Sequence, residues 1–388
     1  MSPSIEWPHC SILFKRSMND VGKVSIDNMK RDYVIVGSGL TGAVIARKLA
    51  DAGKDIIVVE RRSRLGGNVA DAVHPSGVNV HIYGPHLFRT QSEEIWGFVT
   101  RFAEFHAYRH QVKVEIDGIM ENWPIAASYI HRVCGENWRP ELEKEEPSNF
   151  EEAALCLMPW KIYETFVKGY TEKQWGVSAK ILLAELCKRF CVRQDDNPYL
   201  TPAALYQGVP TEGFSHLMRR MLEGIPVVLN CDYLQNRCEF KHRKKLIFTG
   251  PIDEYFDFKL GKLAYRGQHR KTTYVTDIDW WLPCGVVNTP ADGGHIRDIE
   301  WKHMMRPDYA NQIRGTVLTR ETPYSPENPD DYEYPFPDEA NRTLYRRYRK
   351  LAEIDPGLLL CGRLGEYCYY DMDHAIARAI GLADEILL

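Results

Sequence analysis

Two absences limit what this chain can be. It has no excess of positive charge, because 49 Lys and Arg residues stand against 53 Asp and Glu residues, for a net charge of −4. Binding to nucleic acid depends mainly on neutralising phosphates, so generic nucleic-acid binding is excluded, although a local cluster of arginines around one phosphorylated ligand is not. The chain also has no run of eighteen apolar residues, and we expect no membrane span.

Cysteine pairs and targeting signals are also missing. The ten cysteines are too dilute for a disulfide scaffold and never show C-x-x-C spacing. Cys187 and Cys191 are one helical turn apart but lack a second ligand pair, so we predict no metal site. Met1 to Asn28 lacks the basic start, apolar stretch and cleavage site of a secretory signal. We interpret residues 1–30 as an N-terminal extension and expect a cytoplasmic protein.

The composition that remains is that of an ordinary globular protein. Hydrophobic residues make up 44% of the 388 residues and charged residues 26%, which excludes disorder and coiled coil as descriptions of the whole. A typical domain has roughly 150 residues, so the length predicts two or three cores. Internal repeats are absent.

The first chemical signal is a glycine turn between a strand and a helix. Asp32 to Val36 predicts a strand, GSGLTG (residues 37–42) follows directly, and Ala43 to Ala52 has helical periodicity. A second apolar run, Asp55 to Val59, ends in Glu60 and completes a βαβ unit. In such a unit the glycines let the backbone approach a pyrophosphate at the helix N-terminus, and the acid accepts hydrogen bonds from a ribose.

The residues after this unit indicate which dinucleotide it binds. The run ERRSRLGGN (residues 60–68) resembles the second phosphate-contacting segment of the flavoprotein family that includes amine oxidases, and NAD dehydrogenases usually lack it. Paired glycines let backbone N–H groups reach the pyrophosphate, while an arginine neutralises it. The sequence therefore favours FAD.

Five further blocks carry a resemblance to one family. They are GPHLFRT (84–90), GYTEKQWG (169–176), YQGVP (206–210), FTGPIDEYFD (248–257) and GRLGEYCYYDM (362–372). In this order and spacing the chain resembles the bacterial UDP-galactopyranose mutases from about Arg31 to its C-terminus. The GYTEKQWG and GRLGEYCYYDM blocks are long and rich in rare residues, which makes the resemblance specific.

The resemblance implies an α/β fold of three interleaved parts. A discontinuous Rossmann-like FAD-binding domain would comprise residues 31–90, 205–260 and 338–388. An inserted helical domain would span 91–200, and an antiparallel sheet domain 261–337. The residue pattern fits this independently, because Phe150 to Lys188 is amphipathic and poor in Gly and Pro, while Thr272 to Thr319 carries short β-branched runs.

The resemblance also implies an isomerase that interconverts UDP-galactopyranose and UDP-galactofuranose. Reduced flavin attacks the anomeric carbon through N5 as the nucleotide diphosphate leaves, the adduct opens to an iminium and recloses through another hydroxyl, and the diphosphate returns. Because the cofactor carries the covalent step, no protein nucleophile is expected. A departing and returning diphosphate requires fixed positive charge, for which arginine is suited.

Positions in the matching blocks predict three groups of site residues. Those expected to act in the reaction are Arg189, Arg297, Tyr334, Tyr369, His86 and Arg89. Those expected to hold the cofactor are Gly37, Gly39, Leu40, Thr41, Glu60, Arg61, Gly67, Asn68, Arg363, Asp371 and Met372. Those expected to bind substrate are Tyr170, Gln174, Trp175, Arg189, Tyr199, Arg297, Tyr334 and Tyr369. Without the blocks, Arg189 would be read as a salt-bridged helix residue and Trp175 as a helix anchor.

Two departures from the family pattern leave alternatives open. The flavin-side loop of the family commonly reads G-x-H-x-F-H-T, and here the second histidine is Arg89. A permanent cation near the isoalloxazine would favour anionic reduced flavin or would bind an acidic group. Ahead of Arg297 stands GHI (residues 294–296), where an aromatic and a small polar residue are usual. The alternatives are a mutase acting on a GDP-hexose and a flavin-independent mutase with a divalent cation on the diphosphate.

Two hypotheses of other classes also remain at this stage. The FAD signature alone is consistent with an amine-oxidase-like oxidoreductase, and the arginines are consistent with a non-catalytic sensor of nucleotide sugars. In every case the expected partner is a small molecule, and we expect the protein to form a homodimer or a larger homo-oligomer.

Overall fold

A five-stranded parallel sheet carries the glycine turn. The computed structural model describes residues 30–291 and 293–388. The strand order is β10 (Val227–Val228), β2 (Ile56–Val59), β1 (Arg31–Val36), β11 (His242–Phe248) and β17 (Leu358–Leu360), and every neighbouring pair is parallel. Stretches that lie far apart in the sequence therefore build one Rossmann-like sheet, which confirms the α/β class.

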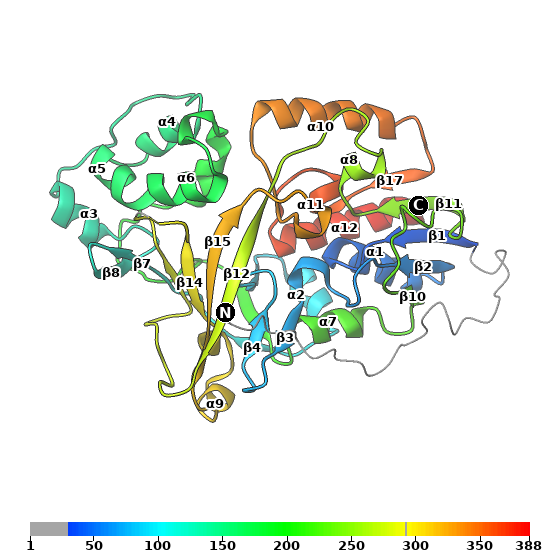
Figure 1. Cartoon of the computed structure of the whole chain (residues 1–388), viewed down its shortest axis with the longest axis horizontal. Coiled ribbons are helices and arrows are strands. Elements are labelled where there is room, and N and C mark those ends of the chain that lie inside the picture. Colours follow the sequence, from blue (N-terminus) through cyan, green and yellow to red (C-terminus); the bar gives the residue numbers. More distant parts are fainter. Residues whose placement is uncertain (1–29, 292) are drawn as a thin grey trace, which may run out of the picture.

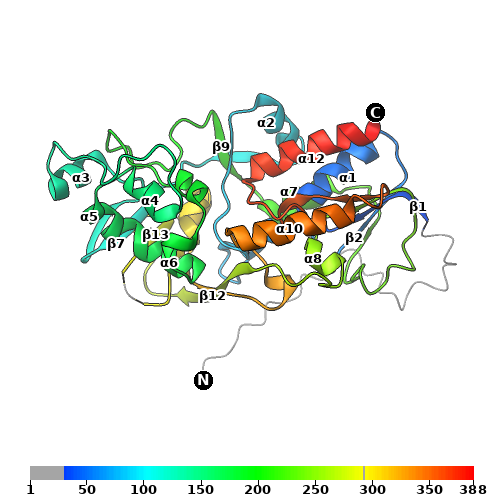
Figure 2. The ribbon, with the colours of Figure 1, turned by 90° about the horizontal axis from the view of Figure 1, so that it is seen from above.

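Helices cover both faces of this sheet. Figure 2 shows α1 (Leu40–Asp51) and α12 (Met372–Leu387) on one side, with α8 (Ile252–Tyr255) and α10 (Glu339–Ala352) on the other. Successive residues of a strand point to opposite faces, so Tyr33 and Ile35 pack with the first pair of helices and Val34 packs with the second. The helix α7 (Phe214–Met221) adds to the core on the α1 side. Burial on both faces explains why these strands are almost continuously apolar.

A second sheet of seven strands forms the middle of the molecule. Its order is β16 (Tyr334–Pro335), β12 (Tyr265–Val275), β15 (Thr316–Tyr324), β14 (Arg297–Glu300), β13 (Val286–Asn288), β7 (Val112–Ile116) and β8 (Ile119–Asn122). All neighbours are antiparallel except β13 and β7. The strands β7 and β8 come from the segment that the sequence division assigned to the helical part, so the sheet extends beyond 261–337.

The helical part lies at the far end of this sheet (Figure 1). It contains α3 (Ala127–Cys134), α4 (Phe150–Leu155), α5 (Trp160–Ile162), a π-helical segment (Tyr163–Lys168), α6 (Gly169–Trp175) and two 3-10 turns (Ala179–Ile181 and Ala184–Arg189). The amphipathic run from Phe150 to Lys188 is thus divided into short helices. Pro159 and the left-handed Gly176 stand at two of the breaks. The side chains of Phe150, Tyr163 and Phe166 form its core together with Val114 of β7.

Smaller elements complete the fold. The strands β5 (Phe88–Thr90), β9 (Tyr206–Pro210) and β6 (Phe105–Ala107) form one sheet, and β3 (Asp71–Val73) pairs with β4 (Asn79–His81). The remaining elements are α2 (Glu93–Thr100), α9 (Pro307–Ala310), α11 (Gly362–Gly365) and the 3-10 turns Gly67–Val69, Trp301–Met304 and Pro329–Asp331. No helix in the described ranges has the length and apolar character needed to cross a membrane.

Candidate active site

A cavity of about 730 Å³ lies where the Rossmann-like sheet, the seven-stranded sheet and the helical part meet. All but one of the site residues predicted from the sequence line it. The exception is Tyr199, whose ring instead lies under the exposed Arg109 guanidinium, 3.7 Å from centroid to carbon. The structure therefore brings together, at the cavity wall, Gly37, Gly39, Leu40, Thr41, Glu60, Arg61, Gly67, Asn68, His86, Arg89, Tyr170, Gln174, Trp175, Arg189, Arg297, Tyr334, Arg363, Tyr369, Asp371 and Met372.

Two glycine turns face each other at one end of the cavity. Gly37 has a φ of +99°, and a Cβ there would lie 2.1 Å from the Oγ1 atom of Thr249. A Cβ on Gly67 would lie 3.0 Å from the Cα atom of Gly39. Gly39 precedes α1 and provides no side-chain cap, which leaves first-turn N–H groups of this helix open to the cavity. This cradle has the room and the donors that a pyrophosphate requires.

Glu60 directly follows β2 beside this cradle and is 4% exposed. Its Oε2 accepts hydrogen bonds from the backbone N–H and the hydroxyl of Ser38, at 2.8 and 2.7 Å, and its Oε1 accepts one from the Arg62 N–H at 2.8 Å. A carboxylate offers about four acceptor positions, so one remains for a ribose hydroxyl. The geometry fits the interpretation of Glu60 as the ribose acid.

Of the two arginines that follow Glu60, Arg61 was expected to contact the cofactor, but it pairs with carboxylates of the protein. Arg61, expected to neutralise the pyrophosphate, pairs with Glu254 at 2.6 Å and with Asp330 at 3.3 Å. Burial opposes its charge, but Glu254 and the nearby aspartates, Asp330 among them, together outweigh burial and raise the pKa of Arg61. Arg62, which was not singled out, lies over the Tyr83 ring and donates to Asn68 Oδ1 at 3.2 Å. The charge of Arg61 is therefore already balanced by protein carboxylates.

A column of aromatic rings and guanidinium groups forms another wall. The Arg189 guanidinium lies 4.1 Å from the centroid of the Tyr369 ring, and the Arg363 guanidinium lies 4.9 Å from the same ring. The rings of Tyr369 and Tyr334 are nearly parallel, 6.2 Å apart. Within the described part of the chain, no carboxylate pairs with Arg189, which is exposed because it faces the cavity. Arg189 is thus a cation available to an anionic ligand.

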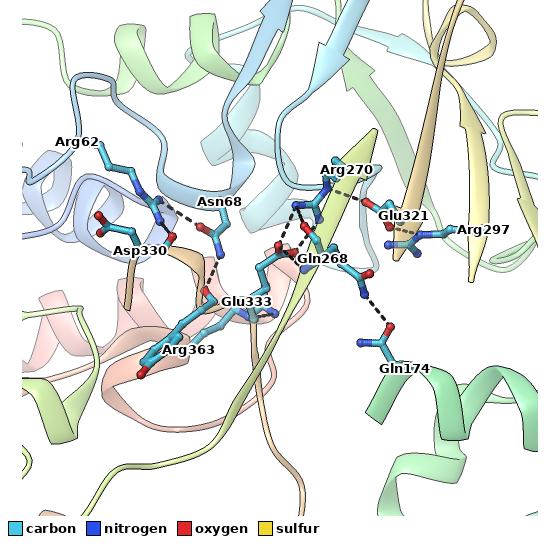
Figure 3. A network of polar contacts seen from close by, with 11 residues as sticks. Arg62, Asn68, Gln174, Gln268, Arg270, Arg297, Glu321, Asp330, Glu333 and Arg363 are labelled. Carbon is cyan, nitrogen blue, oxygen red and sulfur yellow. Dashed lines mark hydrogen bonds and ion pairs between the residues drawn. The ribbon is translucent and has the colours of Figure 1, made fainter. Parts of the chain in front are cut away.

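Arg297 belongs to a buried network of four charged groups (Figure 3). Its Nε donates to Glu321, which also accepts from Arg270 Nε at 2.8 Å, and Arg270 in turn pairs with Glu333 at 2.7 Å. Burial alone would raise the pKa of Glu321, but the two arginines hold it below its ordinary value. Glu321 also raises the pKa of Arg297 against the effect of burial. Arg297 is therefore a permanent cation held at the cavity wall.

Arg89, the main departure from the family pattern, does not stand alone in the cavity. It donates to Asp371 at 2.9 Å, and both side chains are about one third exposed. Asp371 precedes α12, and its carboxylate lies within 4.8 Å of ligand atoms of Asp373 and His374. The ion pair with Arg89 already occupies Asp371, so this group supports no metal proposal.

Two buried histidines, His81 and His110, and the half-buried His86 lie near the Arg89–Asp371 pair and the cavity. Burial, together with neighbouring cationic groups, lowers the pKa of His86 and of His110 to about 3. Burial likewise lowers the pKa of His81 to about 4, and His81 accepts a hydrogen bond from the His86 N–H at 2.9 Å. His86 Nδ1 has no hydrogen-bond partner within the described ranges. A neutral imidazole with an unused ring nitrogen therefore lines the cavity.

Helix α6 presents aromatic and amide groups at the opposite end of the cavity. The Tyr170 ring lies 4.9 Å from Trp123, and Trp175 is nearly buried with its ring edge-on to Phe336. Gln174 accepts a hydrogen bond from Gln268 at 2.8 Å (Figure 3). An aromatic platform with an oriented amide suits a nucleobase.

Sequence reasoning missed the residues that hold these groups in place. Glu321 lies on β15, Arg270 on β12 and Glu333 directly before β16, and nothing in their local sequence marks them as partners. The one available signal is that all three are charged residues within or next to strands, because a charge that becomes buried requires a partner or a ligand.

Comparisons with known proteins agree with this geometry. Residues 165–369 match the family model described as UDP-galactopyranose mutase, and residues 35–102 match a NAD(P)-binding Rossmann-like domain. A probable UDP-galactopyranose mutase of Klebsiella pneumoniae is 33% identical over 376 residues, covering 92% of this chain and 95% of that protein. A dTDP-fucopyranose mutase of Escherichia coli is 29% identical, covering 90% and 97%.

Solved structures share the fold. A reduced UDP-galactopyranose mutase superposes with a TM-score of 0.73 at 16% identity, covering 92% of this chain and 95% of that chain. A putrescine oxidase superposes less closely, with a TM-score of 0.59 at 13% identity and coverage of 92% and 99%. The Rossmann-like architecture is therefore one that mutases and amine oxidases have in common.

Proposed function

Because this chain belongs to the UDP-galactopyranose mutase family of isomerases, we propose that it interconverts the pyranose and furanose forms of a nucleoside diphosphate hexose. We propose UDP-galactose as the first substrate to test. The relatives named for UDP-galactopyranose and for dTDP-fucopyranose indicate that base and sugar vary within the family, so a GDP-hexose remains the alternative.

The observation that carries the proposal is the convergence of Arg189 and Arg297 on one cavity. Arg189 comes from the helical part and Arg297 from the seven-stranded sheet. Arg189 has no carboxylate partner within the described ranges, and Arg297 uses only Nε for Glu321. The remaining guanidinium donors of both residues suit the oxygens of a diphosphate that leaves and returns.

The end of the cavity that is lined by the two glycine turns fits FAD. The facing glycine turns provide the pyrophosphate cradle, Glu60 provides a ribose acceptor, and the unpartnered His86 Nδ1 offers a polar contact further along the wall. Bound in its reduced form, FAD would supply the nucleophile for the anomeric carbon. We propose that Arg363, Asp371 and Met372 complete the cofactor site, since all three line the same cavity.

The protein's own contribution would be positioning, charge and exclusion of water. Arg189 and Arg297 would bind the diphosphate, Tyr334 and Tyr369 would offer hydroxyl groups, and Tyr170 would stack on the base. His86 and His110 stay neutral at physiological pH because burial holds their pKa near 3. Neither histidine would act as an imidazolium acid in this reaction.

The test is turnover of nucleotide sugars in parallel. Purified protein reconstituted with FAD and reduced with dithionite is incubated with UDP-galactose, dTDP-fucose and GDP-hexoses, and ring-contracted products are separated by chromatography. We expect conversion of UDP-galactose. Turnover of another sugar nucleotide alone would change the substrate and keep the class, whereas no turnover of any would overturn the proposal.

The same incubation without FAD or reductant tests the flavin-independent alternative. The Arg89–Asp371 pair is the observation that favours it, because it places a permanent cation where the family has a histidine. Activity that survives removal of FAD and requires a divalent cation would support that reading.

A further inference from the structure

The hairpin loop that leads into Arg297 is built around a lysine from a different part of the molecule. Strands β13 and β14 pair through Asn288 and Arg297, and the Thr289 N–H donates to the Ile296 carbonyl at 2.8 Å, closing the base of the loop. Lys173 of α6 donates through Nζ to the carbonyls of Thr289, Ala291 and His295, the last two at 2.7 and 2.8 Å. These carbonyls come from both arms of the loop, so the ammonium group joins one arm to the other.

The backbone of α6 approaches the same loop closely. A Cβ on Gly169 would lie 2.2 Å from the carbonyl oxygen of Pro290, so only glycine permits this contact. Gly169 and Lys173 are four residues apart and share one face of the helix. Tyr170 and Gln174, also four apart, share the neighbouring face that lines the cavity. One helix thus contacts the loop and the cavity at once.

A second cation holds the C-terminal end of α6 against the sheet. Arg266 of β12 is 5% exposed and donates to the carbonyls of Gln174 at 2.8 Å and Lys173 at 3.2 Å. These are the orphan carbonyls of a helix end, which require donors when they are buried. The helix that bears the proposed base-binding residues is therefore connected to the sheet at both ends.

We propose that Lys173 is a positioning residue that fixes the two described arms of the loop, residues 289–291 and 293–296, and through them Arg297, relative to the base-binding face of α6. The proposal rests on the proposed function, because it takes Arg297 as a diphosphate ligand. Its physical sense is preorganisation: a ligand that touches both Tyr170 and Arg297 binds well only if their spacing is set before it arrives.

The test compares Lys173→Met with Lys180→Met by hydrogen exchange and by titration with inorganic pyrophosphate. Lys180 lies on the same helical part, its side chain is 69% exposed, and among the described residues its ammonium group pairs only with Glu151, at 3.6 Å, which makes it a matched control. In Lys173→Met we expect faster exchange confined to residues 169–176, 288–291 and 293–297. We also expect pyrophosphate affinity to fall about tenfold, the loss of roughly one charge-assisted contact.

A double-mutant cycle separates positioning from direct contact with the ligand. If Lys173 acts through Arg297, adding Lys173→Met to Arg297→Ala causes little further loss of pyrophosphate affinity. Additive losses, or unchanged exchange in both segments, would overturn the proposal. Lys173→Arg is a second variant in case Lys173→Met does not fold. It keeps the charge, but the planar guanidinium does not suit three carbonyls around one nitrogen, so we expect an intermediate loss of pyrophosphate affinity.

Failure of the proposed function gives a different result. Wild-type protein that does not bind pyrophosphate would remove Arg297 as a diphosphate ligand. The exchange comparison would still decide whether Lys173 holds the loop, because it needs neither substrate nor turnover.

Discussion

Arg297 donates its Nε–H to Glu321, a carboxylate with no exposed side-chain surface, and through it is connected to Arg270. A buried carboxylate between two arginines stabilises both cations, and it leaves the terminal nitrogens of Arg297 for a ligand. We therefore expect Glu321 to act on the proposed site through the charge of Arg297, without touching substrate.

Glu321→Gln is expected to lower the free energy of unfolding by about 3 kcal/mol, because it removes one partner of a buried ion-pair network. Urea denaturation followed by circular dichroism measures the change. Glu385→Gln, at an exposed position of α12, is the control and should differ from wild type by less than about 0.5 kcal/mol. A loss for Glu321→Gln as small as that of the control would contradict the charge network.

Arg189→Met is expected to reduce pyrophosphate affinity at least about tenfold while leaving the melting temperature nearly unchanged, because Arg189 has no carboxylate partner to lose within the described ranges. Isothermal titration calorimetry measures the affinity. Arg219→Met, on the exposed side of α7, removes the same charge away from the cavity and should bind like wild type. Equal losses in the two variants would mean that Arg189 contributes only to the overall charge.

Substitutions at the two glycines of the first turn are expected to have different effects, one on folding and the other on FAD binding. Gly37→Ala places a Cβ 2.1 Å from Thr249 Oγ1 at a φ of +99°, so it should lower the melting temperature and the yield of folded protein. Gly39 has an ordinary φ of −68°, and a Cβ there meets nothing closer than 3.9 Å. Gly39→Val should therefore fold but fill the cradle and prevent FAD binding. Melting temperature and flavin absorbance after reconstitution distinguish the two, and flavin retained by folded Gly39→Val would argue against the cradle.

Three histidines whose pKa is lowered in the folded protein predict how its stability depends on pH. His81, His86 and His110 have folded pKa values of about 4, 3 and 3, below the ordinary 6.5, so the unfolded chain binds protons that the folded chain does not. Their contribution to stability is therefore present above pH 6.5 and is lost as the pH falls toward 3. Each proton contributes about 1.4 kcal/mol per pH unit.

His110→Gln should reduce this slope by about one proton between pH 5 and pH 6. Urea midpoints measured across that range give the slope for each variant. His269→Gln, at an exposed position, is the control for the substitution itself. An unchanged slope in His110→Gln would show that His110 titrates alike in both states.

The Rossmann-like unit and the glycine-lined end of the cavity follow from short stretches of sequence. The glycine turn, Glu60 and the first strand and helix lie within thirty residues of one another, and their roles depend on local backbone geometry. The structure places α1 at Leu40–Asp51 and β2 at Ile56–Val59, close to the predicted bounds. Such elements can be predicted from the sequence because steric limits on glycine and the period of the apolar residues act over a few residues.

Pairing between distant charges follows no such local rule. Arg61 meets Glu254 across 193 positions and Arg89 meets Asp371 across 282, and in both cases a charge expected to face a ligand is balanced by the protein. The same holds for β7, which joins the second sheet beside β13, and for Lys173, which enters a loop more than a hundred residues away.

The amino-acid sequence alone thus specified the Rossmann-like unit and the family, and all but one of the site residues that it predicted line the cavity, because these depend on local turns and on blocks of contiguous residues. Which arginines remain available to a diphosphate, and which are already paired, depended on how three interleaved parts pack. The charge balance in a buried site depends on which charged side chains lie next to one another in space. Strand pairing and helix docking determine which side chains these are.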